Sequence, residues 1–250
     1  MMTNETLRKM NELKLFGMAH AFTQQMESPS ANHLGFEERI GLLIDHEATF
    51  RDDKRLQRLL VSAKLRESAC VEDIDYEARQ GLDRAEMASL ALCNWVRHGA
   101  NVLVTGATGL GKTWIACALG TQACRHGMTA KFERVPTLLE DLSLAHSERT
   151  FRKRLAALAK FDLLILDDLG INALTPERRS DLLEVIEARS GRRSTIVTSQ
   201  LPVKRWHDYL ADGNPTVADA IMDRLVSSSH RITLEGKSIR PTLGQKSRKK

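Results

Sequence analysis

Hydrophobic positions in the first third of the chain follow a helical period. Between Phe36 and Ala63 they recur every three or four residues in two stretches, namely Phe36, Ile40, Leu43, Ile44 and then Leu56, Leu59, Leu60, Ala63. Because this spacing gathers each set on one face, it predicts two amphipathic helices. An earlier helix is expected to end near the Ser-Pro-Ser break at residues 28–30 and to carry Leu7, Met10 and Leu13. Together these segments predict an all-helical N-terminal domain over residues 1–80.

The pattern changes after residue 80. A helix opened by Asp83, with Glu86 as its capping partner, is expected to run to Gly99. From residue 100 onward, short apolar runs alternate with helical stretches, which is typical of a parallel sheet wrapped by crossover helices. The expected strands are residues 101–105, 129–135, 161–167, 194–199 and 231–234, and the clearest helices are 112–126 and 176–190. The sequence therefore predicts an α/β core over residues 81–242, with a five-stranded parallel sheet flanked by helices.

Charge is distributed unevenly along the chain. The net charge is +5, but residues 237–250 carry six Lys or Arg and no acid, so the rest of the chain carries −1. The basic tail, residues 243–250 in our division of the chain, is one candidate for contact with nucleic acid. A second basic cluster lies between the second and third expected strands and consists of Arg149, Arg152, Lys153 and Arg154.

Two further features limit the classes of function. Cys70, Cys93, Cys117 and Cys124 form no C-x-x-C pair, which argues against a zinc site and a disulfide framework. Cys117 and Cys124 stand seven apart on one expected helix, where they would serve as small apolar contacts. No stretch approaches the roughly 20 apolar residues of a membrane-spanning helix, and the N-terminus lacks a secretory apolar core. We expect a cytoplasmic protein with no membrane partner.

The segment after the first expected strand carries a specific phosphate-binding motif. Residues 106–113 fit G-x-x-x-x-G-K-[ST] in a strand–loop–helix context, and they are Gly106, Ala107, Thr108, Gly109, Leu110, Gly111, Lys112 and Thr113. Glycines let successive backbone N–H groups face phosphate oxygens, and the following helix adds its positive dipole end. Lys112 is expected to neutralise the β- and γ-phosphates, and the Thr113 hydroxyl to bind Mg²⁺. The motif predicts Mg²⁺ and ATP as cofactors.

Acidic and polar side chains follow the later strands. Asp167 and Asp168 end the apolar run of the third strand, where ligands bind in open α/β sheets. We assign Asp167 to the metal and Asp168 to orienting or deprotonating the attacking water. After the fourth strand, Ser199 or Gln200 is placed to sense the γ-phosphate, with Ser199 favoured. Arg224 lies on a short helix before the last strand.

Four motifs in this order carry a resemblance. The segments GATGLGKT, LLILDDLG, TIVTSQLP and AIMDRL resemble the AAA+ family, in its initiator and helicase-loader clade that includes DnaA and DnaC. A narrower likeness, over residues 5–242, is to the IstB family of ATP-binding helpers of insertion-sequence transposition. It is carried by NWVRHGANVLVTGATGLGKT, TSQLPVKRW and SSSHRITLEGKSIRPT.

The resemblance implies an ATP-dependent regulator that self-assembles on duplex DNA, remodels or selects a target site and recruits a partner transposase. It implies a Walker A loop over residues 106–113, a Walker B pair at Asp167 and Asp168, and a first sensor at Ser199 or Gln200. It also makes Arg224 an arginine finger that reaches ATP held by a neighbouring subunit. A finger acting in trans implies a homo-oligomer with ATP at its subunit interfaces. DNA contact of this kind is non-specific and falls with salt.

Two departures from the family pattern bear on activity. Most AAA+ proteins have glutamate where Asp168 stands, so we expect slow ATP hydrolysis. Only about 16 residues follow the last expected strand, too few for a C-terminal lid domain, and Arg240 is the one candidate for a second sensor. Three other functions stay open, namely a DnaC-like replicative helicase loader, a small-molecule kinase and a DNA-binding scaffold that holds ATP without hydrolysing it.

Overall fold

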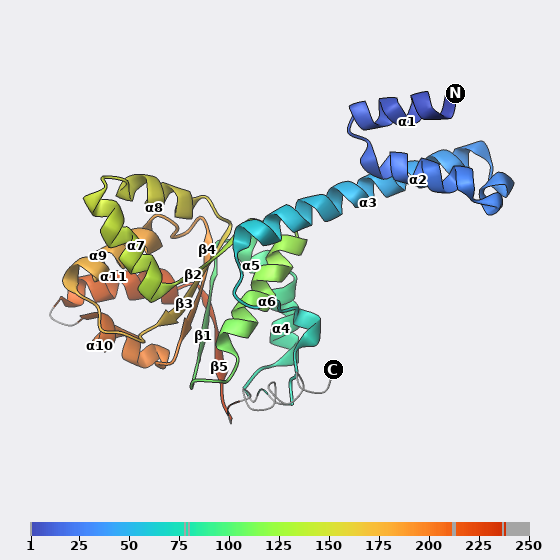
Figure 1. Ribbon diagram of the computed structural model, residues 1–250. Coiled ribbons are helices and arrows are strands. Elements are labelled where there is room, and N and C mark those ends of the chain that lie inside the picture. Colours follow the sequence, from blue (N-terminus) through green and yellow to red (C-terminus); the bar gives the residue numbers. More distant parts are fainter. Residues whose placement is uncertain (1, 78, 80, 212–213, 237, 239–250) are drawn as a thin grey trace. The chain divides into compact units, whose positions relative to one another are not determined.

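The computed structural model describes residues 2–77, 79, 81–211, 214–236 and 238 (Figure 1). The chain separates into two compact units between Arg58 and Leu59. The segment 59–80, which we had assigned to the helical domain, thus clusters with the second unit. Arg240 and the basic tail at 243–250 lie outside the described residues.

The first unit is helical, but its helices differ from those expected. Lys14 has a φ of +60°, which interrupts the helix expected in this region. Two helices, α1 (Met2–Glu12) and α2 (Phe16–Glu27), therefore replace the single one. A short turn, η1 (Pro29–His33), follows at the predicted break. The two helices expected after it are one continuous helix, α3 (Phe36–Ala63). Its central stretch, DHEATFRDDKR, is polar but contains no proline or glycine, so the apolar stripe stops there while the helix continues.

The approach to the core begins with a turn, η2 (Val71–Asp73), and the helix α4 (Arg84–Ala91). The predicted cap of α4 is confirmed, because the Asp83 carboxylate accepts the Glu86 N–H at 2.8 Å. The helix does not reach Gly99 as expected. Cys93 adopts a φ of +56°, which ends one helix and starts a second, α5 (Asn94–Arg97).

The core sheet confirms the five predicted strands with small changes of bounds. The strands are β1 (Asn101–Gly106), β2 (Ala130–Arg134), β3 (Leu163–Leu169), β4 (Ser194–Ser199) and β5 (Ser229–Leu234). They are all parallel, in the order β2-β3-β4-β1-β5. The strand β4 lies between β1 and β3, so the segments that follow these three strands meet at one edge of the sheet.

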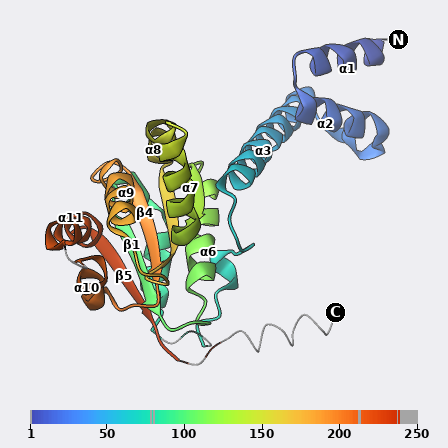
Figure 2. The same ribbon diagram turned by 60° about the vertical axis from the view of Figure 1, so that its left-hand side comes forward.

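Helices cover both faces of the sheet (Figures 1 and 2). Figure 1 shows α4, α5 and α6 (Lys112–Arg125) on one face, and on the other α7 (Val135–Ser147), α8 (Phe151–Ala159), α9 (Pro176–Glu187) and α11 (Pro215–Val226). A turn, η3 (Val203–Arg205), and α10 (Trp206–Ala211) precede α11. The α/β class predicted from the sequence is confirmed. No helix in the described part of the chain is long and apolar enough to cross a membrane.

Successive side chains along each strand point to opposite faces of the sheet, so the hydrophobic core has one part on each face. Leu164 and Leu166 pack with the helices α7, α9 and α11, while Ile165 between them points to α6. The helix α6 approaches closely because it has glycine at position 120. A Cβ there would come within 2.9 Å of Ile165 and 3.0 Å of Leu65. The phosphate-binding motif at the start of α6 is thereby held firmly against β3.

Three buried thiols provide a test of this packing. Cys93, Cys117 and Cys124 are buried, and burial raises the pKa of each thiol from 9.0 to about 11. Unfolded chains release these protons near pH 9 and the folded protein near pH 11. The free energy of unfolding therefore keeps its full value below pH 9. It falls as the pH rises toward 11, by on the order of 1–2 kcal/mol per thiol. We expect urea unfolding to show this loss.

The matched variant is Cys124→Ala, measured beside the wild type from pH 8 to pH 10.5. The variant is expected to be less stable at pH 8 and to lose less stability as the pH rises, because one titrating thiol is missing. Equal losses in the two proteins would show that this thiol ionises as easily in the folded chain as in the unfolded one.

Candidate active site

The loop between β1 and α6 has the backbone that the motif predicts. Gly109 and Gly111 both have a φ of +86°, a conformation that side-chain-bearing residues rarely adopt. Lys112 begins α6 and is buried, and its ammonium group donates to the carbonyl oxygen of Ala107 at 2.9 Å. The lysine therefore lies across the concave side of its own loop. The loop offers backbone N–H groups, a helix N-terminus and one cation to an anion.

Asp167 is the most deeply buried charge of the site. Its side chain is 0% exposed and accepts the Thr113 hydroxyl at 2.9 Å and the Thr198 hydroxyl at 2.6 Å. Burial raises the pKa of the Asp167 carboxyl, and the neighbouring Asp168 acts in the same direction, while the two hydroxyls and Arg66 oppose the rise. The structure thus brings together Thr113 and Asp167, the two residues assigned to the metal from sequence.

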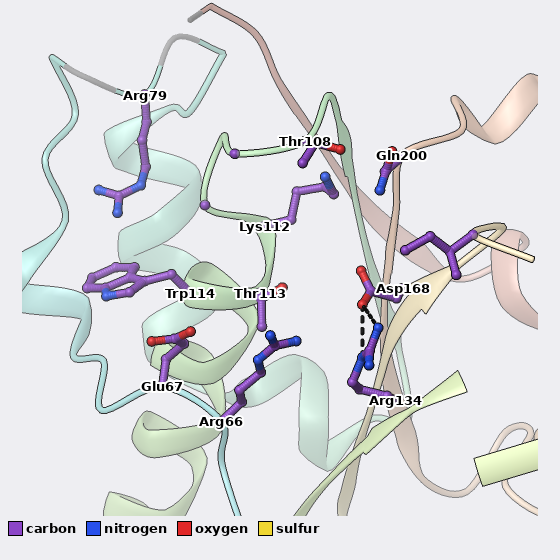
Figure 3. A pocket seen from close by; sticks show the side chains of 13 residues that line it. Arg66, Glu67, Arg79, Thr108, Lys112, Thr113, Trp114, Arg134, Asp168 and Gln200 are labelled. Atoms are coloured by element: carbon purple, nitrogen blue, oxygen red, sulfur yellow. Dashed lines mark hydrogen bonds and ion pairs between the residues drawn. The ribbon is translucent and has the colours of Figure 1, made fainter. Parts of the chain in front are cut away.

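Asp168 points away from the ladder of the sheet because β3 is irregular at this point. The pairing of β3 with β4 shifts register between Leu166 and Leu169, and Asp168 has a φ of +67°. Its N–H donates to the Thr198 hydroxyl at 3.1 Å. Its carboxylate oxygen Oδ2 accepts two hydrogen bonds from Arg134, at 2.8 and 3.0 Å (Figure 3). Arg134 ends β2, so an ion pair joins the ends of neighbouring strands.

The remaining predicted residues lie in different surroundings. Ser199 is fully buried, and its hydroxyl donates to the carbonyl of Leu169 at 2.6 Å, so it is engaged within the sheet. Gln200, the next residue, lines the cavity beside the loop. Arg224 lies on α11, where it donates to Glu187 at 3.1 Å and to Ala220 at 2.9 Å, and it does not line this cavity.

A cavity of about 390 Å³ opens beside the loop (Figure 3). Motif residues, Asp168 and Gln200 line it, together with six residues that the sequence patterns did not indicate, namely Arg66, Glu67, Arg79, Trp114, Arg134 and Ile171. The Arg79 guanidinium lies over the Trp114 ring, 4.5 Å from its centre. Trp114 directly follows the motif and Arg134 ends a strand, so position alone could have indicated both. No local pattern distinguishes Arg66 or Arg79.

The donors at this edge of the sheet fit a magnesium–nucleotide complex. Mg²⁺ takes oxygen ligands, usually one or two from the protein with the rest from water and phosphate. The Thr113 hydroxyl and the Asp167 carboxylate supply such oxygens within hydrogen-bonding distance of each other, next to the anion-binding loop. The cavity has room for a ligand of drug-like or nucleotide size.

Loop, carboxylate and strand order together define a P-loop nucleotide-binding core of the AAA+ type. The chain also matches the family model described as IstB-like ATP binding protein over residues 8–248. It therefore belongs to this family, and the resemblance inferred from the motifs is confirmed.

Two relatives show how far the similarity extends. The chain is 44% identical to the insertion sequence ATP-binding protein y4pL of Sinorhizobium fredii, over 99% of this chain and 100% of the relative. It is 53% identical to the insertion sequence IS1162 ATP-binding protein of Pseudomonas fluorescens, over 81% and 88%. Both relatives are covered over most of their length.

Two solved structures support the fold. The DnaC helicase loader superposes with a TM-score of 0.56 at 20% identity, over 69% of this chain and 100% of that one. DnaI gives a TM-score of 0.57 at 23% identity, over 69% and 91%. At such identities the likeness concerns the fold alone.

The burial of Asp167 leads to a prediction for Asp167→Asn. Because the folded-state pKa is raised, the ionised carboxylate lowers stability at neutral pH, and the wild type regains stability as the pH falls through that pKa. The asparagine keeps an oxygen for Thr198 and carries no charge. We expect the nucleotide-free variant to melt about 2–4 °C above the wild type at pH 7.5, a difference that shrinks at acid pH.

Asp208→Asn serves as the control, because the Asp208 side chain is 86% exposed. Its melting temperature should equal that of the wild type at pH 7.5 and at acid pH. A lower melting temperature for Asp167→Asn at pH 7.5 would mean that the hydroxyls and Arg66 outweigh the cost of burying the charge.

Proposed function

We propose that this protein is a slow ATPase that regulates DNA transposition, assembling on duplex DNA and recruiting a partner transposase. The observation that carries the ATP site is the contact of Thr113 with Asp167 at 2.9 Å, beside the loop of residues 106–113. The insertion-sequence names of the relatives support the link to transposition.

In this proposal, each residue of the loop and of the neighbouring strand ends has one role. Backbone N–H groups of residues 106–113 and the Lys112 ammonium bind the phosphates, and Thr113 and Asp167 hold Mg²⁺, which would offset charge on the β- and γ-phosphates. Asp168 orients or deprotonates the attacking water. Two hydrogen bonds from Arg134, at 2.8 and 3.0 Å, hold its Oδ2 oxygen, so the water would have to approach the other oxygen. This restraint and the short aspartate side chain both favour slow turnover.

We propose Gln200, and no longer Ser199, as the first sensor. The Ser199 hydroxyl is committed to Leu169, whereas the Gln200 side chain lines the cavity. Arg224 remains the proposed arginine finger. Its side chain is 27% exposed and would exchange Glu187 for the ATP of a neighbouring subunit when the homo-oligomer forms.

The base of the nucleotide is proposed to bind against Trp114. This ring lines the cavity next to Thr113, and a guanidinium already lies over its face. Stacking of a base on an aromatic ring contributes about 1–3 kcal/mol. Trp114→Ala should therefore weaken ATP binding by roughly 5- to 150-fold, measured by competition with a fluorescent ATP analogue.

Inorganic triphosphate is the control ligand, because it has no base. Its affinity should be the same for Trp114→Ala and the wild type, and Trp114→Phe should keep most of the ATP affinity. Equal losses for ATP and triphosphate would place the base elsewhere and make Trp114 a support of the loop.

Contact with DNA is assigned to exposed basic residues between β2 and β3. Arg149, Arg152 and Lys153 are exposed, and they follow α7 or lie on α8. Arg154, which we had grouped with them, donates to Glu133 at 2.9 Å and lies 3.7 Å from Asp141, so it is already paired with acids. We propose the first three as contacts to DNA phosphates.

Assembly on DNA is tested by light scattering with linear duplex DNA and ATP. The wild type should form a large particle when both are present, and Lys112→Ala should not, because it loses the cation that the phosphates need. Lys160→Ala, which changes an exposed lysine at the end of α8, should assemble like the wild type. A wild type that stays monomeric on DNA at low salt would contradict the proposal and favour a helicase-loader role, to be tested by pull-down of a replicative helicase.

A further inference from the structure

Arg66 reaches the buried acid of the site from a segment that the functional motifs do not include. It stands three residues after the end of α3, and its guanidinium lies 3.8 Å from the Asp167 carboxylate. Figure 3 shows the side chain extended toward Thr113. The arginine is half exposed, at 49%, while its partner is 0% exposed. One exposed cation thus lies against the carboxylate that would hold Mg²⁺.

The segment that carries Arg66 is fastened along α6. The Leu65 side chain packs at Gly120, so closely that a Cβ on the glycine would lie 3.0 Å from it. The backbone of Arg66 and Glu67 lies beside the thiol of Cys117 on α6 and acts to lower the pKa of that thiol. Farther along, Glu72 accepts from Arg125 at 2.7 Å. These contacts hold the backbone of the segment in place. The guanidinium can therefore change position by rotation of the Arg66 side chain alone.

Two cations cannot share this place. A Mg²⁺ ion bound by Asp167 and Thr113 would lie within a few ångströms of the guanidinium, and like charges at such a distance repel. The arginine side chain has room to swing, because it lines the same cavity as the loop and half of it is in solvent. Phosphate oxygens in that cavity would be its new partners.

We propose that Arg66 is a nucleotide-responsive positioning residue, which compensates the buried Asp167 carboxylate in the nucleotide-free protein and moves to the phosphates when the magnesium–nucleotide complex binds. Arg66 then acts through Asp167: it holds the carboxylate in place for the metal and competes with the metal for it. The inference rests on the proposed ATP site.

The experiment measures melting of the full chain, without nucleotide and then with ATP at increasing Mg²⁺. Arg66→Ala should lower the nucleotide-free melting temperature by about 2–4 °C, and it should have no effect in the Asp167→Asn background, where no charge is left to compensate. With ATP, the variant should reach half of its Mg²⁺-dependent shift at about two- to fivefold less Mg²⁺, the range expected for a partly exposed ion pair. Arg66→Lys should lie between the two proteins.

Arg125→Ala is the matched control, because it removes another arginine contact of the same segment without touching Asp167. Its effect should be equal in both backgrounds, and its Mg²⁺ dependence should be that of the wild type. The inference fails if Arg66→Ala behaves like this control while the wild type still responds to Mg²⁺ and ATP. A wild type that does not respond to Mg²⁺ and ATP at all would overturn the proposed ATP site and the inference together.

Discussion

The burial of one negative charge at the carboxyl edge of the sheet governs the arrangement of the site. Asp167 has no exposed surface, so its carboxylate must be satisfied by other parts of the protein. Thr113 at the start of α6, Thr198 at the end of β4 and Arg66 after α3 all turn toward it. A single carboxylate therefore positions three segments that are distant in sequence. The loop of residues 106–113 is positioned through the first of these segments, the start of α6.

The order of the strands makes this convergence possible. Because β4 lies between β1 and β3, its end supplies Thr198 midway between the loop and the acids. One hydroxyl accepts the Asp168 N–H and donates to Asp167, so it supports both carboxylates despite their different surroundings. The irregular pairing of β3 turns the second acid out of the sheet. Asp167 is thereby buried, while Asp168 is left partly exposed to solvent.

Much of this fold could be predicted from the sequence, because its signals are local. Apolar runs located the five strands, the glycine-rich motif located the loop, and Asp83 marked a helix start that the structure confirms. The interruptions at Lys14 and Cys93 were missed because non-glycine residues with positive φ leave no clear pattern. The continuity of α3 was missed because an apolar stripe reports which face is buried and not where a helix ends. Arg66 and Arg134 depend on contacts with residues 101 and 34 positions away, which periodicity cannot show.

The basic side chains around the loop share one further property. Lys112 donates to Ala107, Arg66 pairs with Asp167 and Arg134 pairs with Asp168, so each has a partner within the chain before any phosphate is present. An incoming triphosphate would compete with these partners, and for the two arginines each exchange would recover only the difference between two ion pairs. In the proposed function, ATP binding is therefore coupled to rearrangement, because Arg66 would leave Asp167 for the phosphates when the magnesium–nucleotide complex binds. The proposed response to ATP, a change in the charge pairing of the site, suits a regulator more than a rapid catalyst.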